Sequence, residues 1–325
     1  MAQRFSALAL GARGCGFESR RPEFYKMKSA YNILESNSFR TLILFFIYFF
    51  LFFLLAFSLR IIFNDDTVSI FIILFAIVYS FLSILFSKKI SLYLLGAKKI
   101  EKKDLPEVYN LVENISIIAG LPKTPEVYII ETNEMNAFAL GTHYSNYLIG
   151  LTRGIINKLN KHELEAVIAH EIAHIKNKDT RLMTIAVFLS GVFSIISEIV
   201  LRIIGNSRNN RSGRGGFILF LIVLIFILLS PIFATLVQLA ISRKREYMAD
   251  ATSALLTRNP LALASALEKI STSPHHFSQN YPNFASLFII NPFEKSKKLL
   301  SKINNLFSTH PPVEERIKIL KEMVL

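Results

Sequence analysis

Two histidines and a glutamate form the strongest chemical signal in the sequence. His170 and His174 belong to the segment HEIAH, and helical residues four apart project from one face, about one turn apart. Both imidazoles could therefore bind one zinc ion. Glu171 is placed to take a proton from water bound to that ion. Two surface histidines beside a glutamate are the alternative interpretation, because a chain with seven histidines can produce this spacing by chance.

A catalytic zinc ion needs a third protein ligand, and the best candidate follows much later in the chain. The segment SRKREYMAD, residues 242–250, predicts a short helix that carries Glu246 and Asp250 on one face. Glu246 could complete a His₂Glu site for one zinc ion per subunit, with the fourth position open for water. Asp250 could accept the remaining N–H of a ligand histidine and so orient its ring. A charged, solvated helix is the alternative for this segment.

The elements around HEIAH are typical of a water-facing domain. Asn160 can cap a helix that begins there, and Glu163 occupies the capping-box position. Charged residues bracket the motif, so we expect this helix in water, which argues against an intramembrane protease whose zinc helix is itself a span. Upstream, Glu126–Glu131 and Tyr147–Thr152 predict short strands with turn residues between them.

Long uncharged, apolar stretches flank this domain. A helix needs roughly 20 residues to cross the hydrocarbon core of a bilayer. Leu182–Ser197 is shorter than that, so a buried or interfacial helix is the alternative to a span there. With 52% apolar residues, the composition also excludes a disordered chain. The other stretches are long enough and predict membrane spans: Thr41–Leu59, Thr67–Ser87 and Gly215–Ser242.

The basic residues indicate how the spans are oriented. The net charge is +13, and lysines gather just after the second stretch, whereas the link Arg60–Asp66 has one basic residue and two acids. Lys and Arg in short flanks mark the cytoplasmic side, so we place residues 88–181 in the cytoplasm. If Glu246 shares a metal with His170, the chain between them must cross the membrane twice or not at all. The basic residues lack interleaved aromatics, so we expect a lipid bilayer as partner and no nucleic acid.

The first 26 residues form a segment of a different kind. They contain the single cysteine, Cys15, which excludes an intrachain disulfide, and they have no apolar run long enough for a signal peptide. The peptide GFES, residues 16–19, is what the T-loop sequence of a tRNA gene would encode. We therefore interpret Met27 as the true start, with a disordered basic tail as the alternative.

Four motifs occur in order along the chain: NAFALG at 136–141, HEIAH followed by Asn177 and Asp179, SRKREYMAD, and THPP at 309–312 followed by Arg316. Together they resemble the HtpX-type membrane zinc metallopeptidases, relatives of the type I CAAX prenyl protease, over about residues 30–325. Leu140 departs from the family pattern, which has a small or hydroxyl residue there. The resemblance implies a zinc-dependent endopeptidase of the bacterial inner membrane, with its active site facing the cytoplasm. It implies degradation of misfolded or damaged membrane proteins and interaction with other membrane quality-control proteases.

The resemblance also implies roles for individual residues. Glu246 becomes the third metal ligand and Glu171 the catalytic base. His310 would stabilise the tetrahedral oxyanion, or would simply precede a helix that starts at proline. A CAAX-type prenyl-peptide protease and a non-catalytic zinc-binding membrane scaffold are the alternative functions. An edge strand that pairs with the backbone of a peptide substrate, or else a plain structural strand, would contain Asn136, Ala137, Phe138 and Ala139.

Together these patterns predict a mainly α protein with a small β-sheet. Four transmembrane helices in two hairpins would carry a cytoplasmic, zincin-like HExxH metalloprotease domain. The predicted parts are an N-terminal tail (1–40), a first hairpin (41–87), a catalytic part with the HExxH helix (88–181), a second hairpin (182–242) and a catalytic part with the third zinc ligand (243–325).

Overall fold

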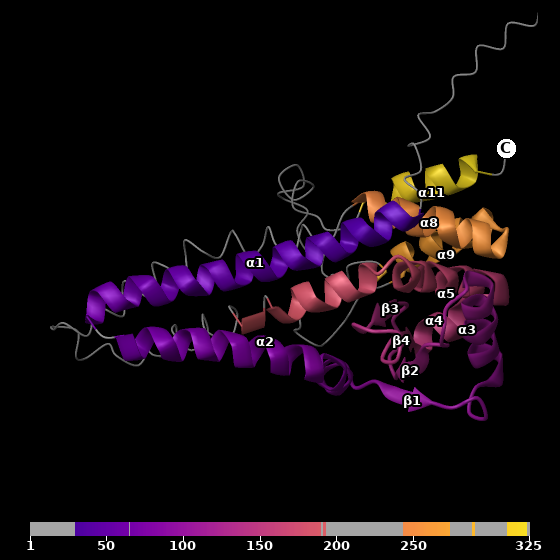
Figure 1. The fold of residues 1–325 in the computed structure, drawn as a ribbon. Coiled ribbons are helices and arrows are strands. Elements are labelled where there is room, and N and C mark those ends of the chain that lie inside the picture. The colour runs from indigo at the N-terminus through magenta and orange to yellow at the C-terminus, as the bar shows by residue number, and fades with distance from the viewer. Residues whose placement is uncertain are drawn as a thin grey trace, which may run out of the picture.

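Two long antiparallel helices project from the part of the molecule that contains the sheet (Figure 1). They are α1 (Ala30–Phe63) and α2 (Asp66–Leu94). Within them, Asn37–Phe57 and Ser69–Leu94 are long and apolar enough to cross a membrane. The computed structural model describes residues 30–64, 66–189, 191–192, 243–273, 288–289 and 311–323.

The outer surfaces of α1 and α2 are apolar, as a lipid environment requires. Phe46 is 67% exposed on α1, and Phe71 is 67% exposed on α2. Water-soluble proteins rarely expose a continuous apolar surface of this kind. The helix α1 begins at Ala30, well before the predicted span at Thr41, so the end of the predicted tail is helical and continues into the hairpin.

A third helical segment, residues 179–189, packs along this hairpin. Its Leu182 and Ile185 are buried in one cluster with Leu44 of α1, and Tyr79 of α2 donates a hydrogen bond to the carbonyl of Phe188 at 3.1 Å. The segment therefore lies against both candidate spans. Residues 193–242, which include the rest of the predicted second hairpin, lie outside the described residues.

The sheet has four strands in the order β1-β2-β4-β3. β2 and β4 are parallel, whereas β1 pairs antiparallel with β2 and β3 pairs antiparallel with β4. This arrangement leaves β3 at an edge. The two strands predicted at Glu126–Glu131 and Tyr147–Thr152 are confirmed as β2 and β4. The strands span Lys98–Ile100 (β1), Glu126–Ile130 (β2), Ala137–Leu140 (β3) and Leu148–Thr152 (β4).

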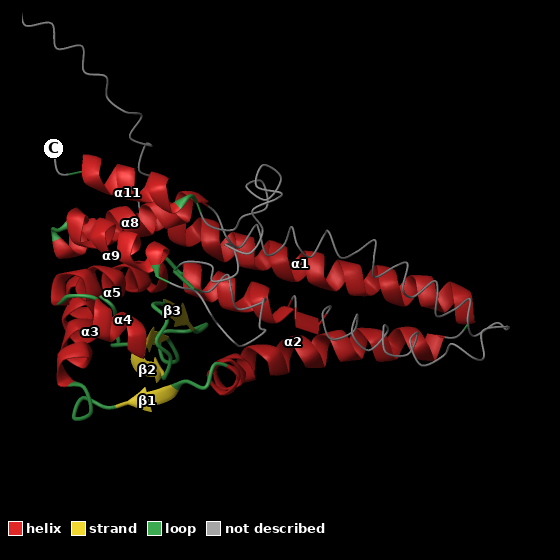
Figure 2. Cartoon of the chain, turned by 180° about the vertical axis from the view of Figure 1, so that it is seen from behind, coloured by secondary structure: helices red, strands yellow, loops and turns green. Residues whose placement is uncertain are grey.

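Helix α5 (Lys161–Lys176) packs between the sheet and the helices from the C-terminal part of the chain (Figure 2). The predicted capping box is confirmed: Asn160 Oδ1 accepts from the Glu163 N–H, and Glu163 Oε2 accepts from the Asn160 N–H, each at 2.9 Å. All residues from Ala166 to Ile175 are buried. Protein rather than water therefore covers most of the HEIAH helix, which differs from the helix in water that its charged flanks predict.

The remaining helices enclose α5. α8 is longer than the short helix predicted for Glu246 and Asp250, and it packs directly on α5. A single apolar core joins α3, α5 and α9 to one face of the sheet, which gives the mainly helical architecture with a small mixed sheet that the sequence predicts. These helices are α3 (Pro106–Ala119), α4 (Arg153–Lys158), α8 (Arg243–Thr257), α9 (Pro260–Thr272) and α11 (Val313–Glu322).

Candidate metal centre

The two histidines of HEIAH point toward one another on the buried face of α5. The distance from His170 Nε2 to His174 Nε2 is 3.1 Å, and the side chains are 1% and 9% exposed. Their spacing of one helical turn produces this approach, because residues four apart stack along one face of a helix.

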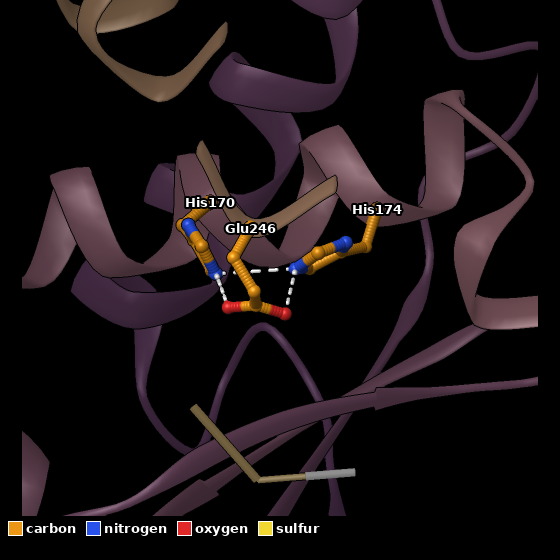
Figure 3. Close-up of side chains that lie close together, drawn as sticks. All are labelled: His170, His174 and Glu246. Atoms are coloured by element: carbon orange, nitrogen blue, oxygen red, sulfur yellow. Dashed lines mark hydrogen bonds and ion pairs between the residues drawn. The ribbon is translucent and has the colours of Figure 1, made fainter. Parts of the chain in front are cut away.

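Glu246 reaches the same point from α8, far away in the sequence (Figure 3). Its two carboxylate oxygens lie 3.8 Å from His170 Nε2 and 3.7 Å from His174 Nε2. One ligand atom from each of the three residues lies within 4.8 Å of the others, and all three residues are buried. The structure thus brings together the residues that the sequence proposes as metal ligands.

Each histidine also has a carboxylate at its other ring nitrogen. Asp250 Oδ1 lies 3.0 Å from His170 Nδ1, where the sequence analysis expects it, and Asp179 Oδ2 lies 3.3 Å from His174 Nδ1. A carboxylate oxygen can only accept, so a proton on each Nδ1 would face an acceptor, and Nε2 would be the atom of each ring that binds a metal. This arrangement is the one that metal-binding histidines adopt.

The donor set fits a divalent cation. The two Nε2 atoms lie 3.1 Å apart, and the two oxygens of the Glu246 carboxylate face them. Zinc–nitrogen and zinc–oxygen distances of about 2.0–2.2 Å place tetrahedral ligands roughly 3.3 Å apart, close to the separations here. Burial lowers the pKa of His174, but Asp179 and two nearby glutamates outweigh it and raise this pKa to about 9, so the site favours positive charge.

Arg316 of α11 completes the charge balance, and the sequence analysis assigns it no role. The guanidinium is 1% exposed and donates from Nε and Nη2 to the two oxygens of Asp250, at 2.8 and 2.7 Å. Its Nη1 lies 3.4 Å from Glu246 Oε2. Burial alone would raise the pKa of Asp250, but Arg316 and His170 together lower it. Asp250 is therefore held as a carboxylate that can orient His170.

Glu171 lies in the same pocket as the two histidines and is 3% exposed. Burial raises the pKa of its carboxyl to about 7, an effect that His174 opposes and Glu246 reinforces. The backbone N–H of Ala139 on β3 donates to this carboxyl. A carboxyl group with a pKa near neutrality can both accept and release a proton under working conditions.

The predicted substrate strand is the edge strand β3, and residues of the same chain already pair with part of it. The Ile289 N–H donates to the Ala137 carbonyl at 3.0 Å, and Phe138 forms an antiparallel bridge with Phe288. Asn136 precedes the strand, and its N–H donates to Thr152 Oγ1 at 2.9 Å. Asn136 therefore anchors the start of β3 to the end of β4. His310 lies outside the described residues.

A membrane-anchored metalloprotease is the class of protein that this fold and these residues define. Residues 102–324 match the model of peptidase family M48, and the chain belongs to this family. This match and the relatives described next confirm the resemblance to HtpX-type metallopeptidases that the motifs indicate.

Relatives from two different bacteria both carry the name "Protease HtpX homolog". The chain is 45% identical to a "Protease HtpX homolog" of Bacteroides fragilis (strain YCH46), over 70% of this chain and 71% of the relative. It is 42% identical to a "Protease HtpX homolog" of Tropheryma whipplei (strain Twist), over 90% of this chain and 98% of the relative. Among solved structures, Ste24p of S. mikatae aligns with a TM-score of 0.46 at 20% identity, covering 89% of this chain and 67% of that chain.

Proposed function

We propose that this metalloprotease is a zinc endopeptidase in which His170, His174 and Glu246 hold the metal and Glu171 is the catalytic base. The observation that carries the proposal is the convergence of two Nε2 atoms and one carboxylate at one buried point. Two imidazoles and one carboxylate are a common ligand set for catalytic zinc, with a fourth position open. The donor set therefore supports zinc over harder cations such as Mg²⁺, which prefer oxygen ligands alone.

The chemistry divides between the ion and the protein. When bound, zinc supplies Lewis acidity that polarises the peptide carbonyl and makes a nearby water more acidic. Glu171 takes the proton of the attacking water and then delivers it to the nitrogen of the leaving amine. Asp250 and Asp179 keep the two imidazoles oriented by accepting from their Nδ1–H groups. Arg316 keeps Asp250 ionised.

The substrate would bind as an extended strand along β3, beside Glu171. Ala137 and Ala139 are the positions whose backbone groups face away from β4, toward Ile289 and Glu171 respectively. The pairing of Ile289 with Ala137 supports the proposal, because it is the contact that an antiparallel peptide would make. The side chain of Phe138 lies on the face of the sheet opposite to the side chains of Ala137 and Ala139, since side chains alternate along a strand. His310 remains our candidate for stabilising the oxyanion.

We further propose four spans in a bacterial plasma membrane, with the catalytic part in the cytoplasm. The packing of residues 182–189 along α1 and α2 supports a third span, because these apolar side chains continue the interior of the hairpin. A fourth span would then return the chain to α8, which packs on α5. Misfolded or damaged membrane proteins are the substrates we propose, in cooperation with other quality-control proteases of the same membrane.

A single substitution tests the central assignment. Glu171→Gln removes the base and keeps the shape of the side chain, so purified protein should retain about one zinc per chain while cleavage of an unfolded test protein is lost. Zinc would be measured by atomic emission and cleavage by gel. Full activity of Glu171→Gln would refute the role of the base, and wild-type protein without zinc would refute the metal site. A farnesylated peptide serves as the second substrate, because its selective cleavage would favour the CAAX-type alternative, whereas zinc binding without any turnover would favour the scaffold.

A further inference from the structure

A buried amide from the first membrane helix contacts the support of the metal site. Asn37 lies on α1 at the beginning of its candidate span and is 3% exposed. Its Nδ2 donates to the Asn177 carbonyl at 2.7 Å and to Asp179 Oδ1 at 2.8 Å. Both acceptors are oxygens that cannot donate, so only the NH₂ group of the amide satisfies them and its orientation is determined.

Asp179 is the residue through which this contact reaches the metal site. It is 1% exposed, and its second oxygen, Oδ2, lies 3.3 Å from His174 Nδ1. Helix α5 ends at Lys176 with Asn177 as its C-cap, and Lys178 has a φ of 59°, which turns the chain so that Asp179 returns beside His174. Arg245 of α8 lies 3.5 Å from Oδ1, so elements α1, α5 and α8 meet at this carboxylate.

We propose that Asn37 is a positioning residue of the metal site, which acts by holding Asp179 so that Oδ2 accepts from His174. The proposal rests on the proposed role of His174 as a metal ligand. Asn37 binds Oδ1 from one side at 2.8 Å, while Arg245 approaches the same oxygen at 3.5 Å. Without the amide, the carboxylate can rotate toward the guanidinium, and the hydrogen bond to His174 lengthens.

The consequence is that a candidate membrane helix contributes to metal binding through Asp179. The carboxylate partner of a ligand histidine fixes its ring and raises its basicity, and losing such a partner typically costs about 10- to 100-fold in metal affinity. Asn37 acts one contact further out, so its loss falls at the lower end of that range. The hairpin of α1 and α2 then supports the metal site in addition to anchoring the protein in the membrane.

Asn37→Leu is the sharpest variant, because leucine has a similar shape, lacks both donors and is compatible with a membrane helix. We expect about 10-fold weaker Zn²⁺ binding for the full chain in nanodiscs, measured by competition with a chromophoric chelator. The visible spectrum of the Co²⁺-loaded protein should also change, since it reports ligand geometry. Thr41→Val is the matched control: Thr41 is also buried, one turn further along α1, donates to the Asn37 carbonyl at 2.9 Å, and should leave Zn²⁺ affinity and the Co²⁺ spectrum unchanged.

A double-mutant cycle separates positioning from general loss of structure. In an Asp179→Asn background, Asn37→Leu should weaken Zn²⁺ binding less than about 2-fold further, because the route through the carboxylate is already broken. Unchanged Zn²⁺ affinity in Asn37→Leu, the same loss in both backgrounds, or an equal loss in Thr41→Val would each overturn the inference. Failure of the wild-type protein to bind Zn²⁺ would instead overturn the proposed metal site.

Discussion

Replacing Arg316 with methionine tests whether the buried carboxylates depend on its charge. The guanidinium donates to both oxygens of Asp250 and to the Ile289 carbonyl, and it lies 3.4 Å from Glu246. Methionine keeps much of the volume but none of the donors. In Arg316→Met, Asp250 and Glu246 remain buried with less compensating positive charge.

The size of the effect follows from burial. Removing one partner of a buried ion pair costs about 3–5 kcal/mol, because the other charge stays desolvated. For a domain of roughly 150–250 residues, each kcal/mol lowers Tm by about 2–4 °C. We therefore expect Tm of Arg316→Met to fall by roughly 6–20 °C when a chelator keeps the metal site empty in every sample.

Two further variants make this test specific. Lys321→Met removes an ion pair of similar length from the same helix, Lys321 to Glu268 at 2.7 Å, but those side chains are about half exposed. It should lower Tm by less than about 4 °C. Adding Asp250→Asn to Arg316→Met should restore part of the loss, because the stranded charge disappears. The reasoning is refuted if Arg316→Met costs no more than Lys321→Met, or if the effects of Arg316→Met and Asp250→Asn simply add.

Two predictions concern the sheet. Burial disfavours the charged form of Glu126, but hydrogen bonds from Lys88, Lys99 and Tyr128 lower its pKa to about 2. The folded-state pKa lies below the unfolded one, so the carboxylate stabilises the fold at neutral pH and loses this effect in acid. Glu126→Gln should therefore lower Tm most at pH 7, progressively less from about pH 5 downward, and hardly at all near pH 2. A difference in Tm that does not vary with pH would contradict this. In Gly150→Ala, the new Cβ would lie 2.1 Å from ring atoms of Phe138. We expect the free energy of unfolding to fall by about 1–3 kcal/mol, read as a lower Tm, and KM to rise as β3 shifts. An unchanged KM would argue against β3 as the substrate strand.

The predictable parts of the metal centre are those that depend on local spacing. The capping box at Asn160 and Glu163 is confirmed, and His170 and His174 face one another because four residues make about one helical turn. Asp250 follows Glu246 by the same interval, which explains why both reach the site from one face of α8. The strands β2 and β4 are also predictable, because their apolar runs are bounded by turn residues.

The missed parts depend on contacts between distant segments. Arg316 lies 66 positions from Asp250 in the sequence, and its spacing from other charges gives no sign of their ion pair. Its burial follows from the packing of α11 on α9 and α8, which is a property of the tertiary structure. The sequence does offer one signal: an arginine on a short helix after THPP belongs to a recognisable motif, although the motif does not reveal its partner.

Asn37 shows that an apolar sequence pattern does not mark where the first long helix begins. Hydropathy divides the chain where the charges end, so Asn37 falls in the predicted tail, while the structure continues α1 through it as one helix. An amide buried at this depth is costly unless it is hydrogen-bonded, and its two acceptors both belong to the turn that follows the HEIAH helix. The favourable pairing therefore fixes the position of α1 against the end of α5. Because Asp179 belongs to the same turn and contacts His174, any shift of α1 along α5 must either break that pairing or move the carboxylate beside His174.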